Sequence, residues 1–210
     1  MKKEYYGIIG SDEIEINRNE LRQRLGGWSS EEADVIEECR KTLAESAVCR
    51  YSLVKTELTV TEDTCAFDTF SIVSRDLAKD LEGCREAWLM GVTLGPEADR
   101  LLARLKIKSP AKHFITDACA SAFVEALADK AEERARKAEA ENKTGMQPQF
   151  RPRYSPGYGD CKIENQKVVL ERLEAKEKLG ISLDETFFMR PSKSITAIIG
   201  VKPGPHTERE

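Results

Sequence analysis

The sequence has 210 residues, of which 40% are hydrophobic and 33% charged, and its formal net charge at pH 7 is −4. A chain of this length can bury a core of its own, and this composition excludes both a wholly disordered chain and a membrane protein. Because acidic residues outnumber basic ones by 37 to 33, there is no general basic surface, and nucleic acid is not expected as a partner.

The first part of the chain, residues 1–84, is predicted to form helices and a hairpin. Ser29 followed by Glu32 forms a capping box, in which each side chain satisfies a backbone N–H of the other residue, and a helix is expected from there to about Ala47. The other patterns of this region predict an arm and short helix over 12–27, a strand over 51–61, a partner strand over 65–73 and a short helix over 74–84.

Residues 85–201 contain the most apolar strand and the longest helix of the prediction. The run 87–94 is continuously apolar and ends at a Gly-Pro pair, which is typical of a central strand covered on both faces. An alanine-rich stripe predicts a helix over 109–141 that approaches its neighbour closely. Beyond Lys130 the stripe gives way to charge, so this end is predicted to project into solvent, with ion pairs such as Glu139 with Lys143.

The remaining elements complete a single predicted domain over 1–210. They are a helix over 96–105, a long loop over 145–161, a helix over 164–179, strands over 182–189 and 194–201, and a tail over 202–210. No internal repeat or linker divides the chain.

The six cysteines and two histidines match no metal-binding pattern. The cysteines lie at least ten residues apart without a CxxC pair, and the histidines complete no zinc spacing. We interpret the cysteines as reduced thiols of a cytoplasmic protein. The N-terminus lacks the apolar segment of a signal peptide, and no stretch approaches the roughly 20 apolar residues of a membrane span.

No pattern of a catalytic nucleophile or of a phosphate-binding loop is present. The sequence contains neither GxGxxG, GxxxxGK[ST] nor GxSxG, and its histidines lie in the long helix (His113) and in the tail (His206). No catalytic residue is therefore predicted. The functional signal lies in the loop 145–161, which combines prolines and glycines with aromatic residues and arginines.

Within this loop, Pro156 and Gly157 indicate a type II turn, since glycine accepts the positive φ that the turn requires. The turn would place Arg153 and Tyr158 at its two ends, a fork for a carboxylate and a flat face with a hydroxyl, which suits a small zwitterionic ligand with an aromatic ring. A structural turn in which Arg153 pairs with a nearby acid is equally compatible. Glu125, at the margin of the alanine-rich stripe, could accept from a ligand ammonium or form a salt bridge at the rim.

Four segments together resemble a known family: RYSPGYGDC (153–161), MRPSKSITAIIG (189–200), TLGPEADRL (93–101) and AFVEALADKAEERARK (122–137). They are similar to the activation (reactivation) domain of cobalamin-dependent methionine synthase, and more closely to its small free-standing relatives. The resemblance spans about 85–201. It implies an α+β fold with a twisted antiparallel sheet and flanking helices.

The resemblance also implies a function. The family binds S-adenosylmethionine in a shallow groove and reactivates a methyltransferase by reductive methylation of its cob(II)alamin, with an electron from a flavodoxin-like donor. The cobalamin would be supplied by a partner protein or domain, so no turnover by this chain alone is expected. The alternative is a module that docks on a corrinoid protein, as a chaperone or scaffold, and has lost the S-adenosylmethionine site; an unrelated small-molecule sensor is a third possibility.

The motif R-x-x-x-G-Y carries the family's binding residues onto this chain. It implies that Arg153 and Tyr158 contact the cofactor, that the backbone of Tyr154 and Ser155 lies along it, and that Gly157 forms the turn. Glu125 aligns with the family's glutamate on the long helix. In this arrangement Arg153 binds the ligand carboxylate and Glu125 its ammonium.

Two family contacts have no clear counterpart. The family's tyrosine after the last matched strand is missing from the segment that follows Val201. The N-terminal aspartate contact is equally hard to place, with Asp63 and Asp68 as the candidates.

Overall fold

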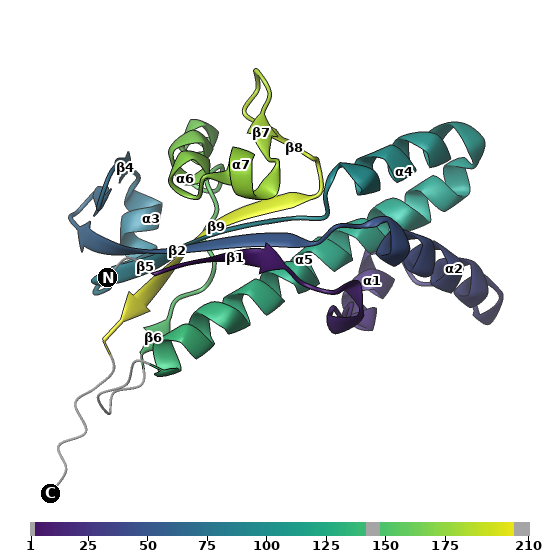
Figure 1. The fold of residues 1–210 in the computed structure, drawn as a ribbon, viewed down its shortest axis with the longest axis horizontal. Coiled ribbons are helices and arrows are strands. Elements are labelled where there is room, and N and C mark those ends of the chain that lie inside the picture. The colour runs from purple at the N-terminus through teal and green to yellow at the C-terminus, as the bar shows by residue number, and fades with distance from the viewer. Residues whose placement is uncertain (1–2, 142–147, 204–210) are drawn as a thin grey trace, which may run out of the picture.

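The computed structural model describes residues 3–141 and 148–203, and its architecture is α+β (Figure 1). Within these residues, strands form a seven-stranded antiparallel sheet in the order β4-β3-β2-β5-β9-β6, and β1 pairs with the same side of β2 as β3. The strands are β1 (Glu4–Ile8), β2 (Arg50–Val60), β3 (Thr64–Phe67), β4 (Ser71–Val73), β5 (Glu86–Thr93), β6 (Gln149–Phe150) and β9 (Ser194–Lys202). The predicted twisted antiparallel sheet with flanking helices is confirmed.

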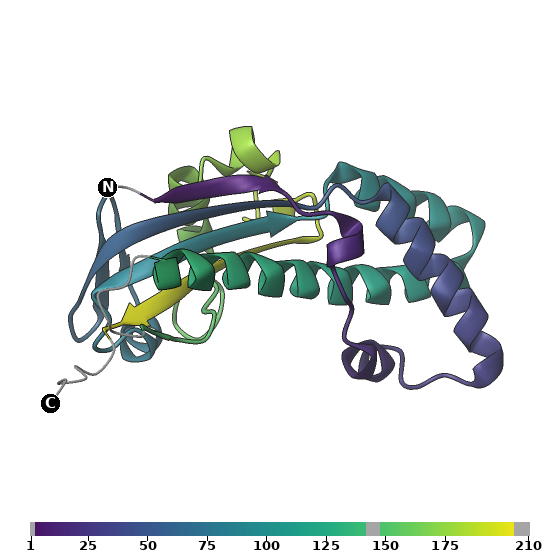
Figure 2. The same cartoon turned by 60° about the horizontal axis from the view of Figure 1, so that its bottom comes forward.

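The central strand β5 is covered on both faces, as its continuous apolar run predicts. Trp88 and Met90 point into one core, beneath the long helix α5 (Pro110–Glu141), and Leu89 points into the other. All three side chains are fully buried. Helices α3 (Arg75–Asp80), α6 (Gln166–Arg172) and α7 (Ala175–Leu179) cover the second face (Figure 2).

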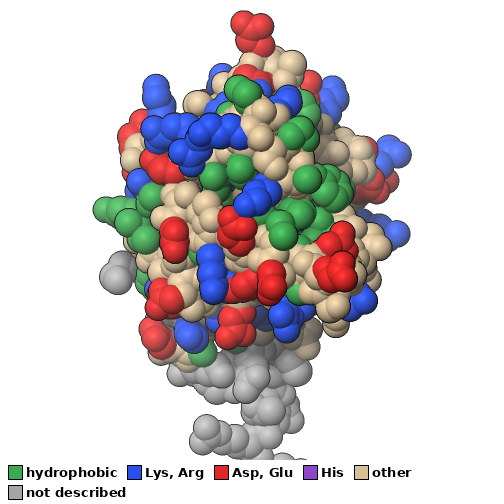
Figure 3. Space-filling view, turned by 90° about the vertical axis from the view of Figure 1, so that its right-hand side faces the viewer, with side chains coloured by type: hydrophobic (Ala, Val, Ile, Leu, Met, Phe, Trp, Pro, Cys, Tyr) green, Lys and Arg blue, Asp and Glu red, His purple; other side chains and the backbone are tan. Residues whose placement is uncertain are grey.

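At one end of the sheet, α5 extends into a helical layer with α2 (Ser30–Ser46) and α4 (Pro96–Lys108), beside the short α1 (Arg18–Arg24). The capping box starts α2 as predicted: Glu32 N–H donates to Ser29 Oγ at 3.3 Å, and Ser29 N–H donates to Glu32 Oε2 at 2.7 Å. Seen from this end, hydrophobic side chains lie among charges of both signs (Figure 3). Among the described residues, no helix has the length and apolarity needed to cross a membrane.

The prediction that α5 projects into solvent beyond Lys130 is wrong. Ala131, Ala135 and Ala138 are buried against the sheet, because a stripe of small side chains lets the helix approach it closely. Glu139 is also buried, with 8% of its side chain exposed. It accepts hydrogen bonds from the indole of Trp88 (2.9 Å) and from Lys55 (3.1 Å), whereas its predicted partner Lys143 lies outside the described residues.

Several strand and helix boundaries differ from the predictions. Strand β1 was not predicted, the segment 65–73 forms two short strands instead of one, and the helix predicted over 164–179 is broken into η2 (Ile163–Asn165), α6 and α7. The break lies at Glu174, whose φ of +50° is incompatible with a continuous α-helix.

The strand predicted over 182–189 is also wrong. Only β7 (Ser182–Leu183) and β8 (Met189–Arg190) are extended, and they pair with each other outside the main sheet. Asp184 closes the turn between them, because its Oδ1 accepts hydrogen bonds from Thr186 N–H (3.0 Å) and Phe188 N–H (3.1 Å). A side-chain cap of this kind makes a tight turn more favourable than a continued strand.

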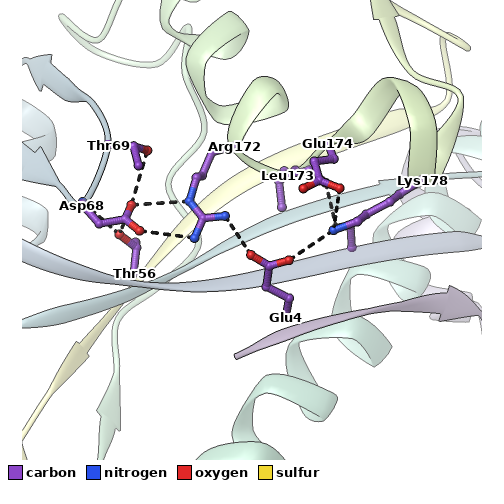
Figure 4. A network of polar contacts seen from close by, with 9 residues as sticks. Glu4, Thr56, Asp68, Thr69, Arg172, Leu173, Glu174 and Lys178 are labelled. Carbon is purple, nitrogen blue, oxygen red and sulfur yellow. Dashed lines mark hydrogen bonds and ion pairs between the residues drawn. The ribbon is translucent and has the colours of Figure 1, made fainter. Parts of the chain in front are cut away.

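A network of charged side chains ties β1 to the second face of the sheet (Figure 4). Arg172, with only 10% of its side chain exposed, pairs with Glu4 at 3.1 Å and with Asp68 at 3.3 Å. Lys178 pairs with Glu4 at 3.3 Å and with Glu174 at 3.2 Å. Asp68, one of the two candidates for the family's aspartate contact, is therefore bound to Arg172.

The six cysteines are all free and buried. Burial raises the pKa of the Cys49, Cys65 and Cys119 thiols to about 12. These thiols are therefore protonated at physiological pH and shielded from solvent.

Candidate functional site

The predicted loop is held against the outer edge of β9. Beyond the short pairing of β6, Arg151 N–H donates to Gly200 O at 2.8 Å. Tyr154 and Ile198 exchange both of their backbone hydrogen bonds, at 3.0 and 2.8 Å. We call residues 151–161 the strap. Its extended half adds backbone pairing to the sheet edge, so the position of the following turn is defined by β9.

After Tyr154 the strap leaves β9 through the predicted turn. Gly157 has a φ of +97°, and Tyr158 N–H donates to Ser155 O at 3.4 Å, as a type II turn requires. A Cβ at Gly157 would lie 2.9 Å from the Ile163 side chain, so both its backbone conformation and this packing favour glycine. The Tyr154 hydroxyl donates to Tyr158 O at 2.9 Å and braces the turn.

Asp160 anchors the far end of the strap to the start of α3. Its carboxylate accepts hydrogen bonds from the Ser74 hydroxyl, from Arg75 N–H (2.9 Å) and from Asp76 N–H (3.2 Å). The Ser74 hydroxyl and these backbone donors lower the pKa of Asp160. The strap is thus fixed at both ends, by β9 and by α3.

Between the turn of the strap and β8 lies a groove of about 440 Å³. Its wall on α5 contains Glu125, and the strap contributes Ser155 and Tyr158. The full lining is Glu125, Ser155, Pro156, Tyr158, Ile163, Gln166, Phe188, Met189, Arg190, Ser192, Ser194, Ile195 and Thr196. The structure therefore brings together three of the predicted site residues, from two segments that are far apart in the sequence.

The floor of the groove is the free edge of β9. Since Ile198 directs its N–H and C=O toward the strap, the backbone groups of Thr196 and Ser194, two and four positions earlier, face the same edge. Ser155 Oγ donates to Thr196 O at 2.6 Å. The Gln166 amide is held by Phe187 O (2.8 Å) and by the Thr196 hydroxyl (3.2 Å), so this floor offers fixed polar groups.

Two aromatic side chains stand at the groove with most of their surface exposed. Tyr158 is 70% exposed and Phe188 is 63% exposed. Exposed aromatic rings in a groove supply flat apolar surfaces on which a planar ring can stack.

Arg153 does not line the groove. Its Nη1 donates to Asp129 at 2.6 Å and lies 3.7 Å from Glu132, and its Nη2 donates to Glu125 at 3.3 Å. All three carboxylates belong to α5, and only 23% of the Arg153 side chain is exposed. Of the two alternatives that spacing left open, the structure shows Arg153 paired with nearby acids. Glu125, with 41% of its side chain exposed, forms the salt bridge that was one of its two predicted roles, and it also lines the groove.

Sequence reasoning missed several lining residues. Arg190, Ser194 and Thr196 lie in the segment 189–200. The family resemblance includes this segment but assigns no role to these residues. Gln166 and Phe188 carry no signal of their own, since each reaches the groove only through the fold. Neither Asp63 nor Asp68 is among the lining residues.

Other grooves of similar size lack the predicted residues. One, of about 500 Å³, lies among α6, α7 and β7 and is mainly apolar, and another, of about 590 Å³, lies between α2 and the segment before α1. The strap groove is the candidate site because the motif residues converge on it.

Two comparisons with known proteins give a match for most of the chain. The family model described as "Vitamin B12 dependent methionine synthase, activation domain" matches residues 33–206. A crystal structure of the MetH reactivation domain bound to AdoHcy is similar with a TM-score of 0.73 and 15% identity, covering 99% of this chain and 80% of that chain. At this identity the similarity shows a shared fold. No curated protein matches the chain.

Proposed function

The chain belongs to the family of the activation domain of vitamin B12 dependent methionine synthase, and on this premise we propose that it binds S-adenosylmethionine in the strap groove. Bound there, the ligand donates its methyl group in the reductive methylation of cob(II)alamin carried by a partner protein or domain. In this reaction cob(II)alamin takes up one electron and the sulfonium methyl group, giving methylcobalamin and S-adenosylhomocysteine. A flavodoxin-like protein supplies the electron, and we expect the reaction in the cytoplasm.

The observation that carries the proposal is the convergence of both motif segments on one groove. The strap contributes Ser155 and Tyr158, and the segment 189–200 contributes the β9 edge and the end of β8. Tyr158 and Phe188 offer stacking surfaces for the adenine, and the backbone groups on the β9 edge can hydrogen-bond to its polar rim. Glu125 supplies a carboxylate for the ammonium group.

The other predicted residues support this site. Tyr154 fixes the strap to β9 and braces the turn, and Gly157 permits the turn. Arg153 holds Glu125 at the wall of the groove. The sulfonium itself activates the methyl group that is transferred. The contribution of this chain is therefore to orient the ligand toward the cobalt of the partner.

Calorimetric titration with S-adenosylmethionine and S-adenosylhomocysteine tests the proposal directly. We expect saturable one-to-one binding, weakened about tenfold or more in Glu125→Gln, because a hydrogen bond to a charged group contributes about 1.5–3 kcal/mol. Glu133→Gln is the matched control, since Glu133 lies on the same helix with 51% of its side chain exposed and does not line the groove. A folded wild-type protein that gives no heat at millimolar ligand would refute the proposal.

One observation favours a second candidate, a docking module that has lost the ligand. Arg153, the residue that the motif assigns to the ligand carboxylate, is occupied by three carboxylates of α5. A module of this kind would capture a corrinoid protein equally well with and without S-adenosylmethionine. Capture that depends on the ligand would instead support the binding function.

A further inference from the structure

The charges along the strap groove are separated between its walls. Glu125 is the acidic residue of the lining, and it belongs to the α5 wall. Arg190, at the end of β8, is the one Lys or Arg among the described residues that line the groove. A ligand that lies across the groove therefore meets a negative charge from α5 and a positive charge from β8.

Arg153 is poorly suited to bind a further carboxylate. Glu125, Asp129 and Glu132 surround its single positive charge. Glu132 also pairs with Arg136, so this cluster of three acids and two arginines carries one excess negative charge. The best-formed contact of Arg153 is the 2.6 Å hydrogen bond to Asp129. An incoming carboxylate would have to displace these partners and would be repelled by them. A cation is attracted to the same cluster.

Arg190 has the opposite situation. Among the residues that the structure describes, Arg190 forms an ion pair only with Asp184, at 3.1 Å from Nη2, and 61% of its side chain is exposed. Asp184 is itself fixed by the Thr186 and Phe188 backbone N–H groups, and these bonds together with the Thr186 hydroxyl lower its pKa. Arg190 is thus held at the groove by a carboxylate that is itself bound to backbone N–H groups, and this pair engages only the Nη2 of the guanidinium.

We propose that Arg190 binds the carboxylate of the amino-acid end of S-adenosylmethionine, while Glu125 binds its ammonium. This inference rests on the proposed function and changes the carboxylate partner from Arg153 to Arg190. A guanidinium matches a carboxylate with two parallel hydrogen bonds, which adds geometric selectivity to charge. Arg190 therefore makes the groove selective for sulfonium nucleosides that carry a carboxylate.

Comparison of S-adenosylmethionine with its decarboxylated analogue tests this assignment. Decarboxylated S-adenosylmethionine keeps the adenosine, the sulfonium and the amine but lacks the carboxylate. The wild-type protein is expected to bind S-adenosylmethionine about 10- to 100-fold more tightly. Arg190→Gln should weaken S-adenosylmethionine binding by this factor and leave the affinity for the analogue unchanged.

Two further variants make the result decisive. Arg104→Gln is the matched control, because Arg104 is exposed on α4 and does not line the groove. Arg153→Gln tests the competing assignment. If Arg153→Gln abolishes the discrimination while Arg190→Gln retains it, the inference is overturned. An equal loss for both ligands in Arg190→Gln overturns it as well. If the wild-type protein binds neither ligand, the proposed function itself fails, which is a separate outcome.

Discussion

The buried carboxylate of Glu139 offers the sharpest test of how α5 is held on the sheet. It accepts a hydrogen bond from the fully buried indole of Trp88 and pairs with Lys55, of which 14% of the side chain is exposed. Burial opposes the charge of Lys55, but the hydrogen bonds that Lys55 donates to Glu139 and Glu86 outweigh this effect, and the pKa of Lys55 is raised. Removal of Glu139 leaves the buried indole of Trp88 without this acceptor and Lys55 with Glu86 as its remaining carboxylate partner.

The expected cost follows from these contacts. Breaking a buried ion pair on one side costs about 3–5 kcal/mol. Lys55 keeps its 2.8 Å pair with the half-exposed Glu86, so we expect the lower end, about 3 kcal/mol, for Glu139→Ala. In a domain of this size that lowers Tm by about 6–12 °C. Glu139→Gln keeps an acceptor for the indole and loses only the charge, so it should cost about 1–2 kcal/mol.

Urea unfolding followed by circular dichroism and tryptophan fluorescence measures both variants. Trp88 reports on the site itself, since its indole is the donor to Glu139. Glu133→Ala is the control, because Glu133 is half-exposed and its 3.4 Å pair with Lys130 is worth less than about 1 kcal/mol. If Glu139→Ala costs no more than Glu133→Ala, the buried pair does not hold the helix to the sheet.

Three other predictions follow from the fold. The native protein should not react with Ellman's reagent at pH 8, because burial raises the pKa of the Cys49, Cys65 and Cys119 thiols to about 12. All six thiols should react in guanidinium. Rapid reaction of these three thiols in the native protein would contradict their burial. The hydrogen bond from Arg172 lowers the pKa of Glu4 below its ordinary 4.5, so this carboxylate's contribution to stability is complete above pH 4.5 and is lost as the pH falls through the lower pKa of the folded state. The unfolding free energy of a Glu4→Gln variant should therefore decline less steeply in acid than that of the wild type. Parallel curves of unfolding free energy against pH would refute this contribution of Glu4. Asp160→Ala should speed hydrogen exchange of the Arg75 and Asp76 backbone amides, which Asp160 caps at the start of α3, while the exchange of β5 amides stays unchanged. Unaltered exchange at these two amides would show that Asp160 does not anchor the strap.

Elements that are defined by capping residues or by a bounded apolar run could be predicted from the sequence. The capping box at Ser29 and the apolar run 87–94 depend on neighbours along the chain, and both appear as predicted. Strand β1 depends instead on pairing with a distant partner, β2, and its Tyr6 and Ile8 side chains stay exposed, so its hydrophobic pattern indicates no buried face. The break at Glu174 is likewise decided by packing, since no glycine or proline marks it.

Charge patterns were the least reliable guide. The run of charges beyond Lys130 is typical of a solvated helix, yet Ala131, Ala135 and Ala138 within it are small enough to bury against the sheet. One glutamate in the run then has to be satisfied inside the protein. Which glutamate this is depends on the rotation of α5 over β5, and that rotation is set by contacts that helical periodicity alone does not contain.

In the candidate site, too, the sequence motif predicts a local feature but not the contacts that depend on the fold. The motif located the strap and its turn, because glycine and proline mark a turn at a known place. It could not decide whether Arg153 faces a ligand or the acids of α5, since that choice depends on how the strap lies beside the helix. With the strap paired to β9 as far as Tyr154, Arg153 meets three carboxylates spaced four and three residues apart on α5. The groove begins only beyond that point, where the strap leaves the β9 edge, and its positive charge comes from Arg190 at the end of β8.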